Sequence, residues 1–294
     1  IYTFDYYKEK SAQEPQREAS KEEELLSNLT QYDLAIDLRR QPETRFLLAK
    51  VNAQLKVGYT SFSDYDKEID ICLRSERDQL RVSTEMNNTS MTLQLLKLVD
   101  AIPFQILESP HSHSFRNDSD CIAIFPFAGN NIKEWPLEYY LLLAEEIINR
   151  KLAQKVNLYI SAKDSSRINN LTLNDSIKIN TNLGMKELLE SLKDNFLTIT
   201  NNSFGAHISS YLRIPIIGIY GGFEKVEEWQ APFNLNTYIY SDLDCSPCHI
   251  PSIDKCPYDM ICLKQITLNT VIGVIEKNIN HRREKSVYLG YINK

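Results

Sequence analysis

After residue 120 the chain alternates short apolar segments with amphipathic ones, and this alternation limits the fold more than any other feature. Apolar strands separated by helices are typical of a parallel sheet that is covered on both faces. Ligands bind such sheets at the carboxyl ends of the strands, so we expect chemistry in the loops after Ile124, Ile160, Thr200 and Ile219. The predicted strands span residues 121–126, 156–161, 177–179, 196–200 and 214–220, and the predicted helices span residues 137–149, 185–193, 205–212 and 267–279.

The first third of the chain carries a shorter form of the same alternation. A capping-box sequence at residues 20–23 opens a predicted helix that ends near Leu29. Strands are predicted at residues 33–38, 57–59 and 69–72, and helices at residues 44–53 and 91–99. Because the chain starts at Ile1 and has no methionine before Met86, we expect a piece of a longer protein, whose opening strands lie upstream.

These elements predict an α/β protein with two Rossmann-like domains. The N-terminal domain, residues 1–107, is expected to be incomplete. Residues 108–119 are polar, contain a proline and form a predicted linker. The C-terminal domain is predicted to span residues 120–280, and residues 281–294 are expected to form a tail.

The net charge and the hydropathy of the chain limit which binding partners and which cellular compartment we expect. The formal net charge of −6 argues against a nucleic-acid partner, so any phosphate must be bound by local groups. No apolar run approaches the roughly 20 residues that a membrane-spanning helix needs, and no signal peptide opens the chain, which favours the cytoplasm. The basic residues Arg282, Arg283 and Lys285 leave two interpretations open: peripheral contact with anionic lipid at the inner membrane, or a solvated tail.

The loop after the first C-terminal strand, residues 126–136, is suited to an anion. Its small residues Ala128, Gly129 and Asn130 let backbone N–H groups approach a ligand, and the helix that follows adds a partial positive charge. Lys133 adds a full charge, although the alternative is an exposed lysine in an ordinary strand–helix loop. We expect Trp135 to be a packing residue.

Two further loops add candidates at the same edge of the predicted sheet. In one, Asn202 and Ser203 precede a helix and can either cap it or bind phosphate and ribose oxygens. Gly205 permits close approach, and His207 lies one turn into the helix, where a structural role is an equal alternative. In the other, Gly221 and Gly222 indicate a tight turn or a backbone close to a ligand.

The sequence lacks both a G-x-G-x-x-G fingerprint after a strand and a Walker A sequence, which disfavours dehydrogenases and P-loop enzymes. Taken in order, its segments resemble glycosyltransferase family nine, the bacterial heptosyltransferase family of GT-B fold. The resemblance spans about residues 30 to 280. The segments that carry it are residues 32–38, 57–59, 125–129, 133–136, 202–207, 215–221, 228–229, 245–248, Cys256 and 262–263.

The resemblance implies an inverting glycosyltransferase that moves a heptose or similar sugar. The donor would be a nucleotide-sugar like ADP-heptose, held by the C-terminal domain without a cofactor or a metal at the reaction centre. The acceptor would be a saccharide or a lipid-linked saccharide of lipopolysaccharide or another surface glycan, on the side of the N-terminal domain. By the resemblance Lys133 contacts the donor phosphate, Asn202, Ser203 and His207 contact phosphate and sugar, and Lys163 or Asp164 faces the ribose.

The sequence also departs from the family pattern. The family commonly has Asp where Asn202 stands and Gly where Phe204 stands, and its N-terminal Gly-Asp loop has no match, so the general base stays unassigned. The Asn-Asn-Ser form is more similar to family-nine-like domains of large bacterial glycosyltransferases, which implies fusion to further domains. Two alternatives therefore stay open: a non-catalytic nucleotide-sugar-binding or scaffolding domain, and a nucleotide-sugar epimerase.

Six cysteines complete the set of candidates. Cys72 and Cys121 are isolated in apolar segments, where we expect inert core residues. The other four follow the spacing C-x2-C-x7-C-x5-C, in which only the first pair has the separation typical of a zinc site. Both zinc binding and a set of reduced structural cysteines are compatible with this spacing. The four are Cys245, Cys248, Cys256 and Cys262.

Overall fold

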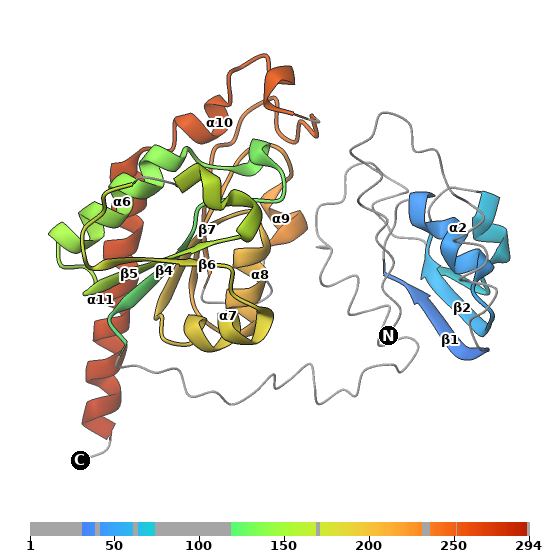
Figure 1. The fold of residues 1–294 in the computed structure, drawn as a ribbon, viewed down its shortest axis with the longest axis horizontal. Helices are drawn as coiled ribbons and strands as arrows, with labels where there is room; N and C mark the ends of the chain where they lie inside the picture. Colours follow the sequence, from blue (N-terminus) through green and yellow to red (C-terminus); the bar gives the residue numbers. More distant parts are fainter. Residues whose placement is uncertain are drawn as a thin grey trace. The chain divides into compact units, whose positions relative to one another are not determined.

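A computed structural model describes two compact units of the chain, one within residues 1–83 and the other within residues 84–294 (Figure 1). The predicted helices at residues 20–29 and 91–99, and nearly all of the predicted linker at 108–119, lie outside the described residues. The structure describes residues 31–38, 42–60, 64–73, 119–168, 171–230, 236–250 and 252–292.

The second unit is built on a parallel sheet of six strands in the order β6-β5-β4-β7-β8-β9. Strands β4, β5 and β6 follow one another outward toward one edge of the sheet, and β7, β8 and β9 follow one another outward toward the other edge. The order therefore reverses between β4 and β7. Parallel sheets bind ligands at such a reversal, outside the carboxyl ends of the strands. The strands are β4 (Cys121–Phe125), β5 (Lys155–Ile160), β6 (Ile177–Thr181), β7 (Leu197–Asn201), β8 (Ile216–Tyr220) and β9 (Thr237–Tyr240).

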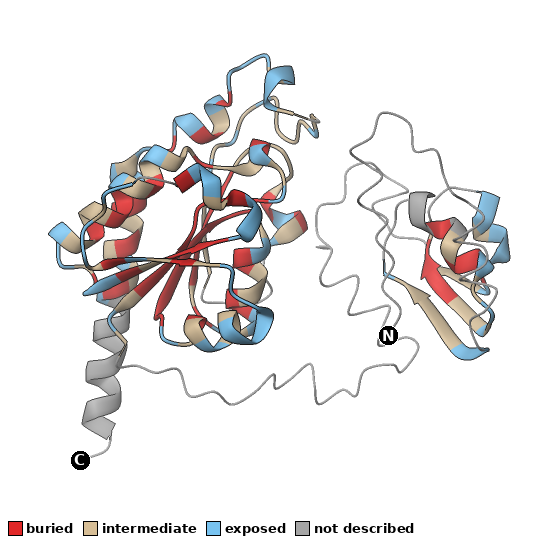
Figure 2. Cartoon of the chain, viewed as in Figure 1, coloured by how far each residue is buried: buried red, intermediate tan, exposed pale blue. Residues whose placement is uncertain are grey.

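Helices cover both faces of this sheet, as the apolar strands predict (Figures 1 and 2). Because side chains alternate along a strand, Ile122 and Ile124 of β4 join one core cluster, while Ala123 and Phe125 join another. The first cluster packs against α6 (Leu137–Asn149) and α11 (Leu268–Ile292), and the second packs against α7 (Met185–Leu192) and α8 (Phe204–Tyr211). The predicted α/β class is confirmed.

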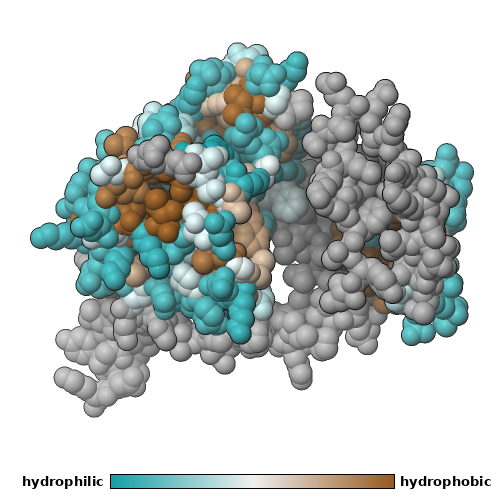
Figure 3. Space-filling model, in the orientation of Figure 1, coloured by the Kyte–Doolittle hydropathy of each residue, from teal (hydrophilic) through white to brown (hydrophobic). Residues whose placement is uncertain are grey.

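Helix α6 has the predicted bounds, whereas α11 continues past the predicted end at residue 279 to Ile292. Strand β9 and several short helical segments were not predicted. Four of these segments have only three or four residues, about one turn, which leaves no periodic pattern in the sequence. None of the described helices is long and apolar enough to cross a membrane. Figure 3 shows a hydrophobic patch on this unit, in the region of α6, surrounded by hydrophilic residues. The short segments are η2 (Asn131–Lys133), η3 (Ala162–Ile168), α9 (Val226–Trp229), η4 (Ile253–Lys255) and α10 (Ile261–Lys264).

The first unit contains a parallel sheet of three strands in the order β1-β2-β3. Arg45 of its helix is fully buried, and its guanidinium lies 3.5 Å from a carboxylate oxygen of Asp37 and 3.6 Å from one of Asp66. The predicted helix at 44–53 begins earlier and ends at Lys50, since Ala53 already belongs to a strand. The elements are β1 (Tyr32–Asp37), α2 (Pro42–Lys50), β2 (Ala53–Tyr59), η1 (Asp64–Glu68) and β3 (Ile71–Leu73).

Candidate functional site

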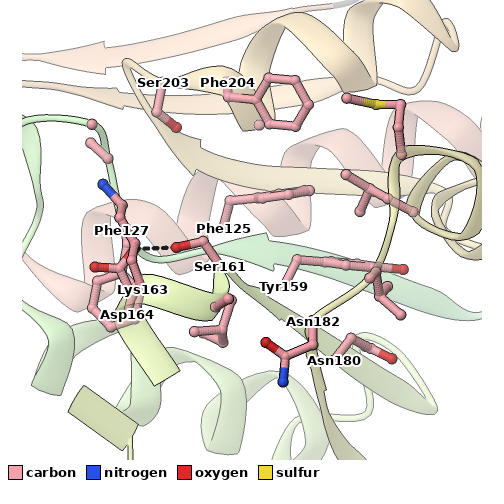
Figure 4. Close-up of a pocket in the computed structure, with 18 of the residues that line it drawn as sticks. Phe125, Phe127, Tyr159, Ser161, Lys163, Asp164, Asn180, Asn182, Ser203 and Phe204 are labelled. Carbon is pink, nitrogen blue, oxygen red and sulfur yellow. Dashed lines mark hydrogen bonds between the residues drawn. The ribbon is translucent and has the colours of Figure 1, made fainter. Parts of the chain in front are cut away.

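A cavity of about 650 Å³ opens at the carboxyl ends of β4, β5, β6 and β7 (Figure 4). It lies at the edge of the sheet where the sequence predicts chemistry, and the loop after β6 contributes as well. Figure 4 shows Ser203 and Phe204 on one side of the cavity and Asn180 and Asn182 on the other, with Phe125 between them. Its lining residues are Phe125, Phe127–Gly129, Tyr159–Asp164, Asn180, Asn182–Met185, Leu188 and Ser203–Gly205.

The wall of the cavity is mainly apolar and aromatic. The rings of Phe125 and Tyr159 stack with their centres 5.0 Å apart, and both side chains are buried. Phe204 and Met185 line the same cavity, yet about half of each side chain is exposed. A wall of this kind, with flat rings and an open rim, accepts a flat heterocycle better than a fully solvated group.

Polar groups stand along the side of the cavity that β5 provides. The carboxylate of Asp164, which is only 8% exposed, accepts a hydrogen bond of 2.6 Å from the hydroxyl of Ser161. One of its oxygens also lies 3.4 Å from the guanidinium of Arg167. A carboxylate has about four acceptor positions. Asp164 therefore keeps the capacity to accept hydrogen bonds from a ligand.

The loop after β4 is held in shape by Glu134, a residue to which no sequence pattern assigned a role. One oxygen of Glu134 accepts a hydrogen bond from the backbone N–H of Ala128 at 3.0 Å, and its other oxygen pairs with Arg167 at 2.6 Å. The guanidinium of Arg167 lies over the ring of Phe127, 3.9 Å from its centre. In the same loop the side chain of Asn130 accepts from the backbone N–H of Ile132 and so caps η2.

Lys133 belongs to a second polar group, which lies beside the residue pair Asn202–Ser203. Its ammonium lies 2.5 Å from the carboxylate of Glu224, and this carboxylate also accepts a hydrogen bond of 3.0 Å from the amide of Asn202. The Lys133 and Glu224 side chains are 18% and 14% exposed. Burial lowers the pKa of His207, and the positive charge of Lys133 lowers it further. His207 is therefore a neutral neighbour of the lysine at neutral pH.

A family model identifies the family to which this chain belongs. The model for glycosyltransferase family 9, the heptosyltransferases, matches residues 24–254, which is more than half of the chain. The chain belongs to glycosyltransferase family 9. It is an enzyme that transfers sugar from a nucleotide-sugar, and the family that the sequence resembles is confirmed. The comparison with curated proteins gives no match.

Solved structures of other glycosyltransferases share the GT-B fold with this family 9 member. Escherichia coli heptosyltransferase WaaC with ADP-2-deoxy-2-fluoro heptose has a TM-score of 0.60 at 13% identity, covering 88% of this chain and 76% of its own. E. coli ADP-heptose lps heptosyltransferase II has a TM-score of 0.63 at 13% identity, covering 90% and 82%. A family 9 glycosyltransferase from Veillonella parvula has a TM-score of 0.61 at 16% identity, covering 90% and 79%.

The predicted donor residues of the family 9 enzyme fall into three places. Five line the cavity, and Lys133, Asn202 and His207 form the neighbouring group. The remaining three, Asn130, Gly221 and Gly222, do not line the cavity. The five that line it are Ala128, Gly129, Asp164, Ser203 and Gly205.

The structure gives packing reasons for the two adjacent glycines. A Cβ at Gly221 would lie 2.9 Å from the side chain of Leu263, and one at Gly222 would lie 3.3 Å from that of Ser246. One local prediction is wrong: Ser203 is the N-cap of α8, but its side chain makes no capping hydrogen bond. Its hydroxyl lies instead 3.3 Å from the hydroxyl of Thr200.

The C-terminal cysteines of the enzyme surround one small cavity of about 140 Å³. All four are reduced and half-buried, and burial raises the pKa of the Cys262 thiol. Within the described residues no group of three or more metal-binding side chains is arranged to hold an ion. Cys72 and Cys121 are half-buried, so the prediction that they are core residues is wrong. The four that line the cavity are Cys245, Cys248, Cys256 and Cys262.

Proposed function

We propose that the C-terminal unit binds a nucleotide-sugar donor, with the nucleoside in the 650 Å³ cavity and the diphosphate between Lys133 and the start of α8. The observation that carries this proposal is the position of the cavity at the carboxyl ends of β4 and β7, near the largely buried ammonium of Lys133. The cavity volume falls in the range of small-molecule sites, about 300–1,000 Å³.

The lining of the cavity supports a nucleoside. Phe125, Tyr159 and the exposed ring of Phe204 offer flat apolar surface for a base. Asp164 lies on the same wall, where its carboxylate can accept hydrogen bonds from the ribose hydroxyls. Lys163, which is exposed, lines the cavity next to it.

The end of the cavity at β7 supports a diphosphate. Ser203 lines the cavity at the N-cap position of α8, but its hydroxyl makes no capping hydrogen bond. The backbone N–H groups at the start of α8 can therefore donate to a phosphate. Asn202 precedes Ser203 in the chain, and its amide shares the Glu224 carboxylate with the ammonium of Lys133. When the sugar leaves, negative charge builds on the diphosphate, and preorganised donors of this kind stabilise it.

The reaction is then transfer of a heptose or a similar sugar to a saccharide acceptor in lipopolysaccharide or another surface glycan. Two of the similar proteins are heptosyltransferases, one bound to an ADP-heptose analogue and one named for lipopolysaccharide. We expect inversion at the anomeric carbon, with a general base from the N-terminal half deprotonating the acceptor hydroxyl. Binding of the donor and saccharide requires no cofactor in this scheme.

Ligand-induced thermal stabilisation tests this proposal. A ligand held at about 100 times its Kd adds about 2.7 kcal/mol to the stability of the folded state. We expect at least one of ADP, GDP, UDP and CDP, and the matching sugar nucleotide, to raise the melting temperature. Leu183→Asp places a negative charge in the cavity lining and should abolish the rise. Leu142→Asp, at an exposed position of α6, is the matched control and should keep it. A screen without any stabilising nucleotide would reject the proposal.

A further inference from the structure

The carboxylate of Glu224 lies within the proposed diphosphate site, where a negative charge is unexpected because it repels an anionic ligand. It comes from the loop after β8, and it reaches Lys133, in the loop after β4, across 91 positions of sequence. The ammonium and the carboxylate oxygen are 2.5 Å apart, and both side chains are more than four-fifths buried. Such a pair is held in a medium of lower dielectric than water, where charges act more strongly than at an open surface.

A second contact fixes the carboxylate from the other side. The Asn202 amide donates to the same Glu224 oxygen at 3.0 Å, and Asn202 is itself buried. Glu224 therefore lies between the lysine and the residue that precedes the N-cap of α8. It cannot swing away without depriving the buried Asn202 amide and the largely buried Lys133 ammonium of their acceptor.

We propose that Glu224 is the counter-charge of the donor site: it positions Lys133 and makes the nucleoside diphosphate product bind more weakly than the nucleotide-sugar. This inference rests on the proposed function. An ammonium has three N–H donors, so Lys133 can keep its contact with Glu224 and still donate to a phosphate. The pair has no net charge, and a phosphate held by Lys133 lies close to the carboxylate as well.

The chemistry of transfer makes this repulsion selective. The bond between the anomeric carbon and the phosphate oxygen breaks, and its electron pair stays on that oxygen. The acceptor oxygen forms the new bond to the anomeric carbon and loses its proton to a base. The product thus carries a free terminal phosphate, whose second pKa is about 6, and so holds one more negative charge than the donor at pH 7.5. A fixed carboxylate nearby repels that added charge.

The test compares the affinities of ADP and of ADP-glucose, a stable ADP-sugar, for the wild type and three variants by calorimetry at pH 7.5. Glu224→Gln removes the charge and keeps the shape. We expect this variant to bind ADP about tenfold more tightly than the wild type, as a unit charge within a few ångströms of a phosphate implies. Its affinity for ADP-glucose should rise by a smaller factor. Asn202→Asp with Glu224→Gln returns a carboxylate to the same contact and should restore wild-type affinity for ADP.

Glu227→Gln is the matched control, because it changes the net charge equally at an exposed position three residues away. It should leave both affinities unchanged. Tighter ADP binding in Glu224→Gln that the double variant reverses supports the inference. Equal or weaker ADP binding in Glu224→Gln, or an equal gain in Glu227→Gln, overturns it. If ADP, GDP, UDP and CDP all fail to bind the wild type, the proposed function itself falls, and the inference falls with it.

Discussion

The side-chain oxygen of Asn201 accepts a hydrogen bond of 2.9 Å from the backbone N–H of Trp135. The same oxygen accepts from the hydroxyl of Tyr140, and the Asn201 amide donates to the carbonyl of Pro126, each at 2.9 Å. Asn201 is fully buried at the end of β7. One amide therefore joins the end of β7 to both ends of the loop that follows β4, and it fixes the two strand ends between which the donor is proposed to bind.

Asn201→Ala should destabilise the C-terminal unit strongly. The change leaves two donors and one acceptor buried without a partner, and each such group costs about 1–3 kcal/mol. We expect a loss of at least about 3 kcal/mol in urea denaturation followed by tryptophan fluorescence. Asn149→Ala, at an exposed position at the end of α6, is the control and should change stability by less than about 0.5 kcal/mol. Similar losses in the two variants would show that the contacts of Asn201 are not needed.

Two glycines of the proposed donor site should respond differently to a methyl group. A Cβ at Gly205 would lie 2.6 Å from the Phe125 ring and 2.7 Å from the Thr200 hydroxyl, whereas a Cβ at Gly129 meets nothing within 4 Å. Gly205→Ala should therefore cost about 1–3 kcal/mol of stability and displace a ring that lines the cavity. Gly129→Ala should leave the melting temperature within a degree or two, as a 0.5 kcal/mol change implies. Thermal melts of both variants, with and without nucleotide, decide this.

The repeating elements of the C-terminal unit were predictable from the sequence. Each strand of the C-terminal sheet from β4 to β8 lies within a few residues of its predicted position. For β4, β7 and β8 the reason is that a strand buried on both faces leaves a run of mainly apolar residues. Strand β9 has a half-buried pattern and four residues, and it gave no such run. The bounds of α6 were predicted because Pro136 marks its start and an apolar stripe continues to Asn149.

The sequence singled out candidate site residues only through their position in a loop. Lys133 and Asn202 were predicted because they lie in the loops that follow β4 and β7. Glu134 and Glu224 were missed, since a carboxylate in a loop gives no signal until its partner is known. Their partners are 33 and 91 positions away in the sequence. Gly221 and Gly222 were singled out by the sequence, but their signal was ambiguous. A glycine pair after a strand indicates close packing and a close ligand equally well.

His207 should make the enzyme less stable as the pH falls. Burial, followed by the charge of Lys133, lowers its pKa in the folded state, so the unfolded chain binds a proton first. Stability rises with pH wherever the unfolded state binds more protons. The contribution is therefore complete above the unfolded pKa of about 6.5 and is lost as the pH falls from there toward the lower folded pKa. His207→Gln should flatten the fall in denaturation free energy between about pH 7 and pH 5. An unchanged slope would show that His207 titrates normally.

Lys133→Ala should reduce kcat/KM by about 100- to 1,000-fold, as the loss of one preorganised group at a developing charge does in other enzymes. Part of this loss has a separate cause, because the variant leaves the Glu224 carboxylate unneutralised beside the phosphate. Removing that charge as well, in Lys133→Ala with Glu224→Gln, should recover some activity, so the two effects are coupled and not additive. Lys178→Ala, at an exposed position of β6, removes one positive charge elsewhere and should leave kcat/KM unchanged. Full additivity of the two substitutions would mean that Lys133 and Glu224 act independently during transfer, and wild-type kinetics in Lys133→Ala would remove the lysine from the donor site.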